Sequence, residues 1–331
     1  MKMRNVLFVG FFGVLACGLL TYVLVDSVVE PQVSREPASV PNNYESLRAC
    51  EKQDILWEKV RATTHKELPE YRKFGFFQLL ALSKQEISIK GKNYSDFAPA
   101  GWKKYLHGRG AIAKVKIVPH NSKYTGIFQG ADCAFLRLSL TYKATGSMPV
   151  APGLALKVLR DGIYSANVSA LVSLDGQGKN FNFFSHPMSN IVPIGTSFGQ
   201  KLVHRVFNKV TTYPEELLAK DMAGINAHGE KLQEVVAPRQ IFFVPDPSLK
   251  FSSEEHEVRD DFMKIREGTT IYQIYIAPEK YAKFNYANYK PENVKGFLKE
   301  SEHVADIVST SEFIASEFGD DGIFFRHQLR P

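Results

Sequence analysis

Short runs in which every second residue is apolar fill the chain between residues 111 and 184. This period is typical of a β-strand that turns one face toward a core. Glycine, proline, aspartate and asparagine separate the runs and indicate turns. Because many short strands in succession must protect their edges, the pattern predicts a closed antiparallel barrel or a sandwich. The clearest runs are Ala113–Val118, Phe135–Leu140 and Leu154–Leu159.

The second half of the chain continues this strand pattern. Apolar runs return at residues 240–244, 269–276 and 304–308, and we expect them to be the returning strands of the same sheet. The ending 316–327 contains several large apolar side chains that are costly to leave in water, so it is predicted to be an ordered strand or a pocket lid.

Helical periodicity occurs on both sides of the strands. Residues 44–86 place leucine, isoleucine and valine on recurring faces. Residues 214–236 form a second predicted helix, with Pro214 near its first turn. One α+β domain with a β core, spanning residues 44–331, fits these patterns best.

The N-terminus has a different character. Lys2 and Arg4 precede an uncharged run from Val6 to Val25, about 20 residues, which is long enough to cross a bilayer as a helix. The run exceeds the apolar region of most cleaved signal peptides, so residues 1–25 are interpreted as a signal anchor, with a cleaved signal peptide as the alternative. The basic flank predicts a domain on the non-cytoplasmic side, periplasmic or lumenal, or exported after cleavage. Residues 26–43, rich in proline, serine and valine, are expected to be a linker.

Charge and cysteine content limit the function classes. The net charge is +6, but lysine and arginine are spread along the chain without a basic block, so no nucleic-acid partner is expected. Cys50 and Cys133 can form a disulfide in an oxidising compartment. The segments 254–256 and 303–306 contain histidine and acidic residues without metal-binding spacing, and we expect them to be solvated surface.

His107 has the clearest potential for chemistry, because it precedes a Gly-Arg-Gly turn at the entrance to a predicted strand. A neutral imidazole there can take a proton from a peroxide and return it to the leaving oxygen. Ser139 can hold the ring through its other nitrogen, and an asparagine side chain can orient the peroxide. The alternative reading of these residues is a turn histidine at 107 and a solvent-facing strand cation at Arg137.

The first half of this region resembles the haem catalase superfamily. Members of that family carry, near the start of the barrel, a basic residue, the distal histidine three positions later, and a glycine-containing turn. Lys104, His107 and Gly110 match this pattern, with lysine where catalases usually have arginine. An Arg-Phe-Ser strand follows in the family, and Arg137-Leu-Ser139 is similar to it.

Two later motifs continue the resemblance in the same order. The family has a Gly-Phe-Ala-Val-Lys strand, and Gly153-Leu-Ala-Leu-Lys157 is similar. It then has an asparagine-containing loop that leads into a pair of phenylalanines, and the segment 180–184, Asn-Phe-Asn-Phe-Phe, resembles that loop. The resemblance therefore implies a catalase-like antiparallel β-barrel with flanking helices.

The same resemblance implies haem as the cofactor and assigns roles to named residues. The peroxide site would consist of His107, Ser139 and an asparagine, either Asn180 or Asn182. The haem contacts would come from Lys104, Arg137, Phe183 and Phe184. Hydrogen peroxide or a lipid hydroperoxide would be the substrate, and the N-terminal helix would hold the protein at the membrane.

One element of the family is missing from the sequence. Catalases bind the haem iron through the tyrosine of an Arg-x-x-x-Tyr segment after the barrel, and no such segment occurs after residue 269. The axial ligand is therefore not identified. The alternative function is that of a haem-free barrel that binds an apolar ligand or a protein partner outside the cytoplasm.

Overall fold

The structure is a computed structural model, and it is built around one large β-sheet and the elements that cover it. The residues that it describes are 18–25, 27–28, 33–34, 40–63, 77, 80–81, 84–85, 88, 96–98, 101–104, 109–120, 128, 131–140, 152–159, 161, 165–170, 172–173, 183–185, 241–250, 258–276, 296, 298–316 and 323–325. The predicted helix 214–236, residues 1–17 and most of the linker 26–43 lie outside this set.

The main sheet has ten strands, and every pairing between neighbours is antiparallel. Its order is β6-β5-β4-β3-β11-β10-β9-β8-β7, with β12 paired to β3. All six predicted strand runs fall on strands of this sheet. The strands are β3 (Arg109–Pro119), β4 (Ala134–Leu140), β5 (Pro152–Val158), β6 (Ala166–Ala170), β7 (Val172–Ser173), β8 (Phe183–Ser185), β9 (Ile241–Pro245), β10 (Thr270–Ile276), β11 (Glu302–Ser309) and β12 (Ile314–Ala315).

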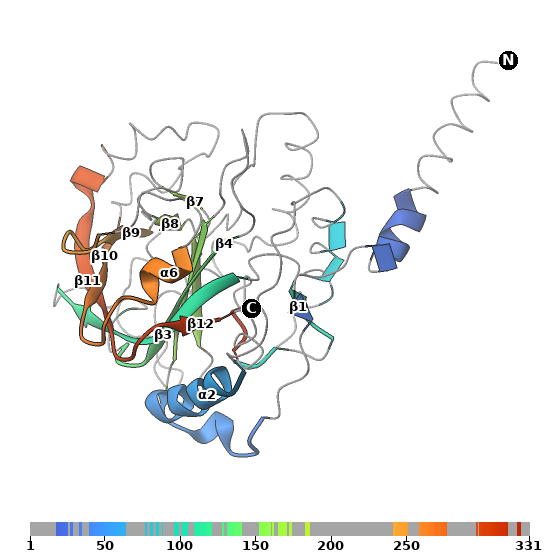
Figure 1. Ribbon diagram of the computed structural model, residues 1–331, viewed down its shortest axis with the longest axis horizontal. Helices are drawn as coiled ribbons and strands as arrows, with labels where there is room; N and C mark the ends of the chain where they lie inside the picture. Colours follow the sequence, from blue (N-terminus) through green and yellow to red (C-terminus); the bar gives the residue numbers. More distant parts are fainter. Residues whose placement is uncertain are drawn as a thin grey trace, which may run out of the picture.

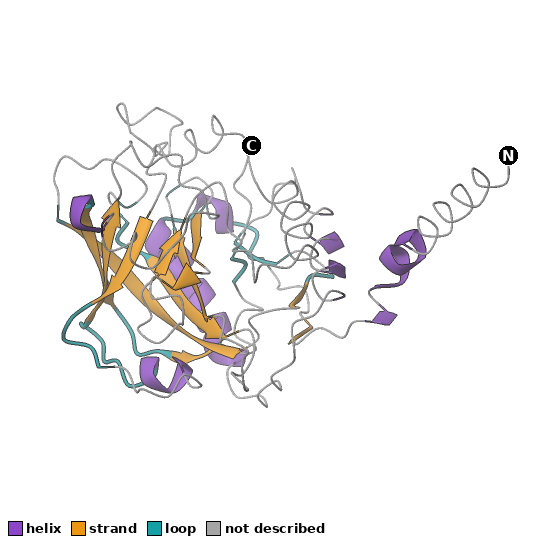
Figure 2. Cartoon of the chain, turned by 90° about the horizontal axis from the view of Figure 1, so that it is seen from above, coloured by secondary structure: helices purple, strands orange, loops and turns teal. Residues whose placement is uncertain are grey.

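The two ends of this order lie on neighbouring segments of the chain. β6 ends at Ala170 and β7 begins at Val172, so one residue separates the first strand of the order from the last. The sheet must therefore curl back toward its own edge, and Figures 1 and 2 show its strands wrapping around a common centre. The prediction of an α+β fold with a barrel-like antiparallel sheet is confirmed at this level.

Alternate residues of the strands fill the inside of the curl. The predicted period of two is confirmed, because the inward residues of β3, β4 and β5 are almost fully buried. Helix α6 (Val258–Phe262) adds Phe262 to this core, where its ring stacks on Tyr272 at 6.3 Å. The inward residues of the first three strands are Ala111, Ala113, Val115, Ile117, Ala134, Leu136, Leu138, Leu154, Leu156 and Val158.

Helix α2 (Ala49–Thr63) covers the outer face of β3 and β4. The buried side of the helix consists of Leu56, Trp57 and Val60. These side chains pack against Ile112 and Phe135, which point away from the barrel interior. Burial of each large side chain contributes about 1.5–3 kcal/mol. The predicted helix 44–86 is confirmed for this stretch, while residues 64–76 lie outside the described set.

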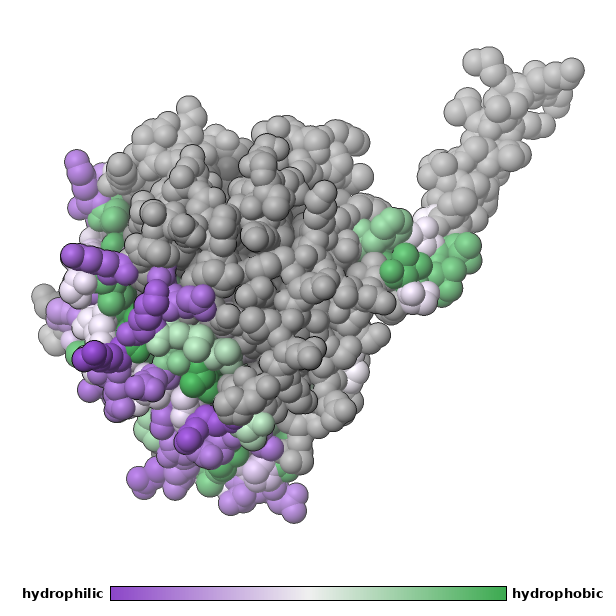
Figure 3. Space-filling view, in the orientation of Figure 1, coloured by the Kyte–Doolittle hydropathy of each residue, from purple (hydrophilic) through white to green (hydrophobic). Residues whose placement is uncertain are grey.

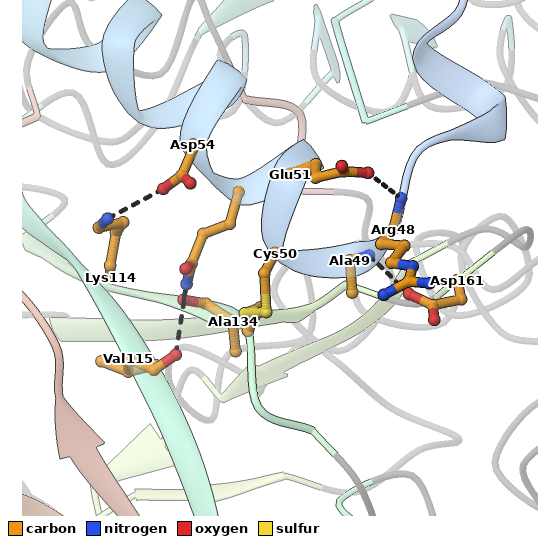
Figure 4. Close-up of a disulfide and its surroundings, with 11 residues drawn as sticks. Arg48, Ala49, Cys50, Glu51, Asp54, Lys114, Val115, Ala134 and Asp161 are labelled. Carbon is orange, nitrogen blue, oxygen red and sulfur yellow. Dashed lines mark hydrogen bonds and ion pairs between the residues drawn. A yellow bond between two sulfur atoms is a disulfide. The ribbon is translucent and has the colours of Figure 1, made fainter.

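A disulfide fastens α2 to the sheet. Cys50 in the first turn of the helix is bonded to Cys133, which precedes β4, with their Cα atoms 5.2 Å apart. Beside it the buried Gln53 side chain donates a hydrogen bond to the Ala134 carbonyl at 2.7 Å. Figure 4 shows the helix lying across the strands at this bond, with Lys114 reaching up to Asp54. The disulfide that the sequence left as a possibility is thus present.

The described part of the N-terminal apolar run, residues 18–25, is helical, as are residues 27–28 after it. Val25 packs with Leu80 and Ala81, while Leu19, Leu20 and Val23 are exposed, and Figure 3 shows apolar surface over this helix where it stands off the body. Among the described residues, no helix reaches the length and apolarity that a membrane crossing requires. Residues 6–17 of the predicted span lie outside the described residues.

Of the predicted apolar segment 316–327, the structure describes residues 316 and 323–325. Ile323, Phe324 and Phe325 are buried and belong to no strand, and whether the segment is a strand or a pocket lid stays a prediction. The Phe324 ring lies edge-on to Trp102 at 4.8 Å. Its backbone N–H donates to the Asp96 carbonyl, which ties residues 323–325 to residues 96–98 beside the sheet.

Candidate functional site

Three of the sequence motifs form one row across the sheet. Gly110 on β3 lies opposite Ser139 on β4, and Ser139 lies opposite Gly153 on β5. One step along, Ile112, Arg137 and Ala155 form the next row on the same face. The antiparallel register therefore brings motifs that are far apart in sequence to one end of three adjacent strands.

Arg137 and Ser139 point away from the apolar interior of the barrel, because they alternate with the inward Leu136 and Leu138. Both are nonetheless buried, at 5% and 3% exposure. Arg137 donates from Nε to the Ser316 hydroxyl at 3.0 Å, and Ser139 donates to the Gly153 carbonyl at 3.4 Å. The interpretation of Arg137 as a solvent-facing cation is therefore wrong, since the covering segments remove it from water.

Gly110 is required for the close approach of β3, β4 and residue 316. A Cβ atom at this position would lie 2.3 Å from the Leu138 carbonyl oxygen and 2.9 Å from the Ser316 hydroxyl. The Ser316 N–H donates to the Gly110 carbonyl at 3.0 Å. The glycine of the first motif thus lets Ser316 reach Arg137.

Lys157, the last residue of the third motif, forms a buried ion pair. Its Nζ lies 2.9 Å from Asp96 Oδ1 and donates to the Ser165 hydroxyl at 2.7 Å. Ser165 in turn donates to Asp96, and the Tyr44 hydroxyl donates to the other carboxylate oxygen at 2.8 Å. The lysine and the carboxylate have side-chain exposures of 1% and 7%, so this network is shielded from solvent.

The network determines the charge state of its members. Burial alone would raise the pKa of Asp96, but the Lys157 ammonium and the hydrogen bonds from Ser165, Lys157 and Tyr44 outweigh it, so the pKa is lowered. Burial, and then the neighbouring Asp96 charge, raise the pKa of Tyr44 far above its usual value. Asp96 therefore stays ionised and Tyr44 stays neutral at physiological pH.

Sequence reasoning missed the partners that complete these sites. Asp96, Ser165 and Ser316 belong to no motif, and they reach the sheet only through the fold. A buried lysine requires a counter-charge. This rule predicts that Lys157 has an acidic partner, but it does not say which residue that partner is.

The remaining predicted site residues are placed only in part. His107, Asn180 and Asn182 lie outside the described residues. The backbone of Lys104 lies on β2 (Lys103–Lys104), which pairs with β1 (Val33–Ser34) in a separate two-stranded sheet. Phe183 and Phe184 begin β8, opposite Phe243 and Phe242 of β9. The roles predicted for these six residues stay predictions.

The iron ligand of the expected haem is not among the residues already discussed. Arg137 and Ser139 are buried two residues apart on one strand face, and both already have hydrogen-bond partners within the protein. Tyr44 and Tyr272 are poor axial ligands, because burial raises the pKa of each hydroxyl and disfavours the tyrosinate form. None of the residues that the structure describes is assigned as the iron ligand.

Comparisons of the chain with protein families, with curated proteins and with solved structures found no match. The resemblance to the catalase superfamily therefore rests on the four sequence motifs alone.

Proposed function

We propose that this chain is a membrane-attached, catalase-like haem protein that acts on hydrogen peroxide or a lipid hydroperoxide. The observation that carries the proposal is the shared row of Gly110, Ser139 and Gly153, with the buried Arg137 one step along.

The row also limits where the distal histidine can act. His107 precedes Gly110 by three residues, which span at most about 11 Å, and Gly110 lies opposite Ser139, so the proposal assigns the two side chains to one site. There His107 would take the proton from one peroxide oxygen and return it to the other. Ser139 would hold the ring, and Asn180 or Asn182 would orient the peroxide.

Haem, when bound, would supply the redox-active iron, and Phe183 and Phe184 are the residues proposed to line its pocket. Arg137, and Lys104 on β2, would hold the propionates by charge-assisted hydrogen bonds. The segments that bury Arg137 would keep its bonds away from water, and charge-assisted bonds are stronger in such a low-dielectric environment.

Two features support attachment to a membrane with the domain on its non-cytoplasmic side. The exposed Leu19, Leu20, Val23 and Leu24 continue the apolar character of the preceding run. The Cys50–Cys133 disulfide is of the kind that persists in oxidising compartments. A membrane-attached enzyme would meet lipid hydroperoxides at their source.

Haemin titration of the purified chain, followed by the Soret band, tests the cofactor. We expect saturable binding of one haem per chain, weakened about 10- to 100-fold in Arg137→Ala, because a charge-assisted hydrogen bond contributes about 1.5–3 kcal/mol. Arg137→Lys keeps the charge at this position and should bind haemin more tightly than Arg137→Ala. The comparison separates loss of the charge from misfolding of the variant. Arg266→Ala removes an exposed arginine and serves as the matched control. A chain that takes up no haemin would refute the proposal.

The packed outer face is compatible with the alternative of a haem-free barrel if haemin does not bind. Arg137 already contacts Ser316, and α2 with residues 323–325 covers much of the face beside it. A haem-free barrel of this kind would bind an apolar ligand or a protein partner.

A further inference from the structure

A cluster of two histidines and one aspartate lies at the far end of β3. His120 follows the last residue of β3, and His303 and Asp306 belong to β11, the neighbouring strand. Their ligand atoms all lie within 4.8 Å of one another. Ten residues separate His120 from Gly110, or roughly 33 Å along the strand, so this cluster is distinct from the proposed haem face.

An irregularity in β11 brings the two β11 side chains to the same face. Tyr275 on β10 lies opposite His303, but its neighbour Ile274 lies opposite Ala305, so Val304 is an extra residue in the strand. Such a bulge reverses the alternation of side chains. His303 and Asp306, three positions apart, therefore point the same way, a juxtaposition that the expectation of solvated surface for residues 303–306 did not include.

His120 is held opposite the bulge by the backbone. Its N–H donates to the Val304 carbonyl at 2.8 Å. The centroid of its ring lies 4.1 Å from that of the His303 ring. The Tyr275 ring also stacks on His303, with the centroids 4.8 Å apart and an interplanar angle of 19°. The Tyr275 hydroxyl donates to Gln273 at 3.0 Å, which fixes the stacked ring. Both imidazoles are thus oriented before any ligand arrives.

Asp306 lies between the two imidazoles. His120 Nε2 is 2.5 Å from one carboxylate oxygen, and His303 Nε2 is 2.8 Å from the other. Tetrahedral zinc with bonds of about 2.0–2.1 Å has its ligand atoms about 3.3 Å apart. The two His–Asp separations differ from this value by less than about 1 Å, and the separation between the two imidazole ligand atoms, at most 4.8 Å, differs from it by up to about 1.5 Å. Side-chain exposures of 48%, 26% and 18% for His120, His303 and Asp306 leave the cluster open to solvent.

We propose that His120, His303 and Asp306 bind a divalent transition-metal ion, with Zn²⁺ as the best fit. Two imidazoles and a carboxylate are the donor set of many zinc sites, and three protein ligands leave a fourth position for water or a substrate oxygen. Tyr275 and Gln273 act as positioning residues, since they hold the His303 ring rather than the metal. The inference does not rest on haem binding.

Titration of the metal-stripped full chain with Zn²⁺, and separately with Co²⁺ followed by its visible absorption, tests this site. We expect binding of one tight equivalent in the wild type, weakened at least about 10-fold by His303→Ala, His120→Ala or Asp306→Asn, since each removes a ligand. Glu267→Gln makes the same acid-to-amide change as Asp306→Asn at an exposed position near the other end of β10 and should bind as the wild type does.

A second readout keeps the test valid if a variant is less stable. Zn²⁺ should raise the midpoint of thermal unfolding of the wild type and of Glu267→Gln, because binding favours the folded state. It should leave the midpoint of Asp306→Asn unchanged. Wild-type affinity weaker than about 0.1 mM, or unaltered affinity in His303→Ala and Asp306→Asn, would show that the carboxylate only accepts hydrogen bonds from the two rings.

Discussion

Replacement of Lys157 by methionine tests the buried ion pair beneath α2 and residues 96–98. Methionine keeps most of the side-chain volume but leaves the Asp96 carboxylate with the hydroxyl donors Tyr44 and Ser165 alone. Lys157 and Asp96 have side-chain exposures of only 1% and 7%, so solvent cannot replace the lost charge. Removal of one partner of such a pair costs about 3–5 kcal/mol. We expect the free energy of unfolding at pH 7 to fall by that amount.

The cost should depend on pH with a defined sign. In the wild type the pKa of Asp96 is lowered, so its stabilising contribution is present above the unfolded value of about 3.9 and is lost as pH falls through the folded pKa. Without Lys157, burial is the dominant influence and raises the pKa of Asp96. The variant then gains stability relative to the wild type as pH falls from 7 toward 4.

Urea denaturation followed by circular dichroism at pH 7, 5.5 and 4 measures this difference. Lys157→Met in an Asp96→Asn background is the control, because it lacks the titrating carboxylate and should show a cost that varies little with pH. A cost below about 1 kcal/mol at pH 7, or one that grows as pH falls, would refute the account of the network.

Two further substitutions address the disulfide and the crowded glycine. Cys50→Ser with Cys133→Ser should lower the free energy of unfolding by about 4–5 kcal/mol, as expected for an 83-residue separation, with reduced wild type as the comparison in urea; an unchanged midpoint would contradict the bond. Gly110→Ala should cost at least about 1–3 kcal/mol and lower the thermal midpoint, because its Cβ would meet the Leu138 carbonyl oxygen. Gly296→Ala, which meets nothing within 4 Å, is the matched control, and equal midpoints in the two variants would contradict the packing described.

The strands and the first helix were predictable because local patterns determine them. The alternation in Phe135–Leu140 and the helical period around Leu56 and Val60 both come from contact with one core. The join between β6 and β7 was not predictable, because strands of five and two residues carry too little pattern to recognise.

The sites were predictable only where their residues lie within one strand. Arg137 and Ser139 share a face because they are two residues apart, which the sequence states directly. Asp96 meets Lys157 across 61 positions, and His120 meets Asp306 across 186, so only tertiary structure brings them together. The alignment of His303 with Asp306 further depends on a bulge, which a regular alternation hides.

Consumption of hydrogen peroxide and of a lipid hydroperoxide by the haem-loaded chain tests the proposed function most directly. We predict turnover by the wild type and a loss of about 10²- to 10⁴-fold in His107→Ala with the Soret band retained, because general acid–base catalysis contributes that much. His256→Ala, the same change outside the four motifs, should turn over as the wild type does. A haem-loaded wild type without turnover, or a His107→Ala variant with the wild-type rate, would contradict the function.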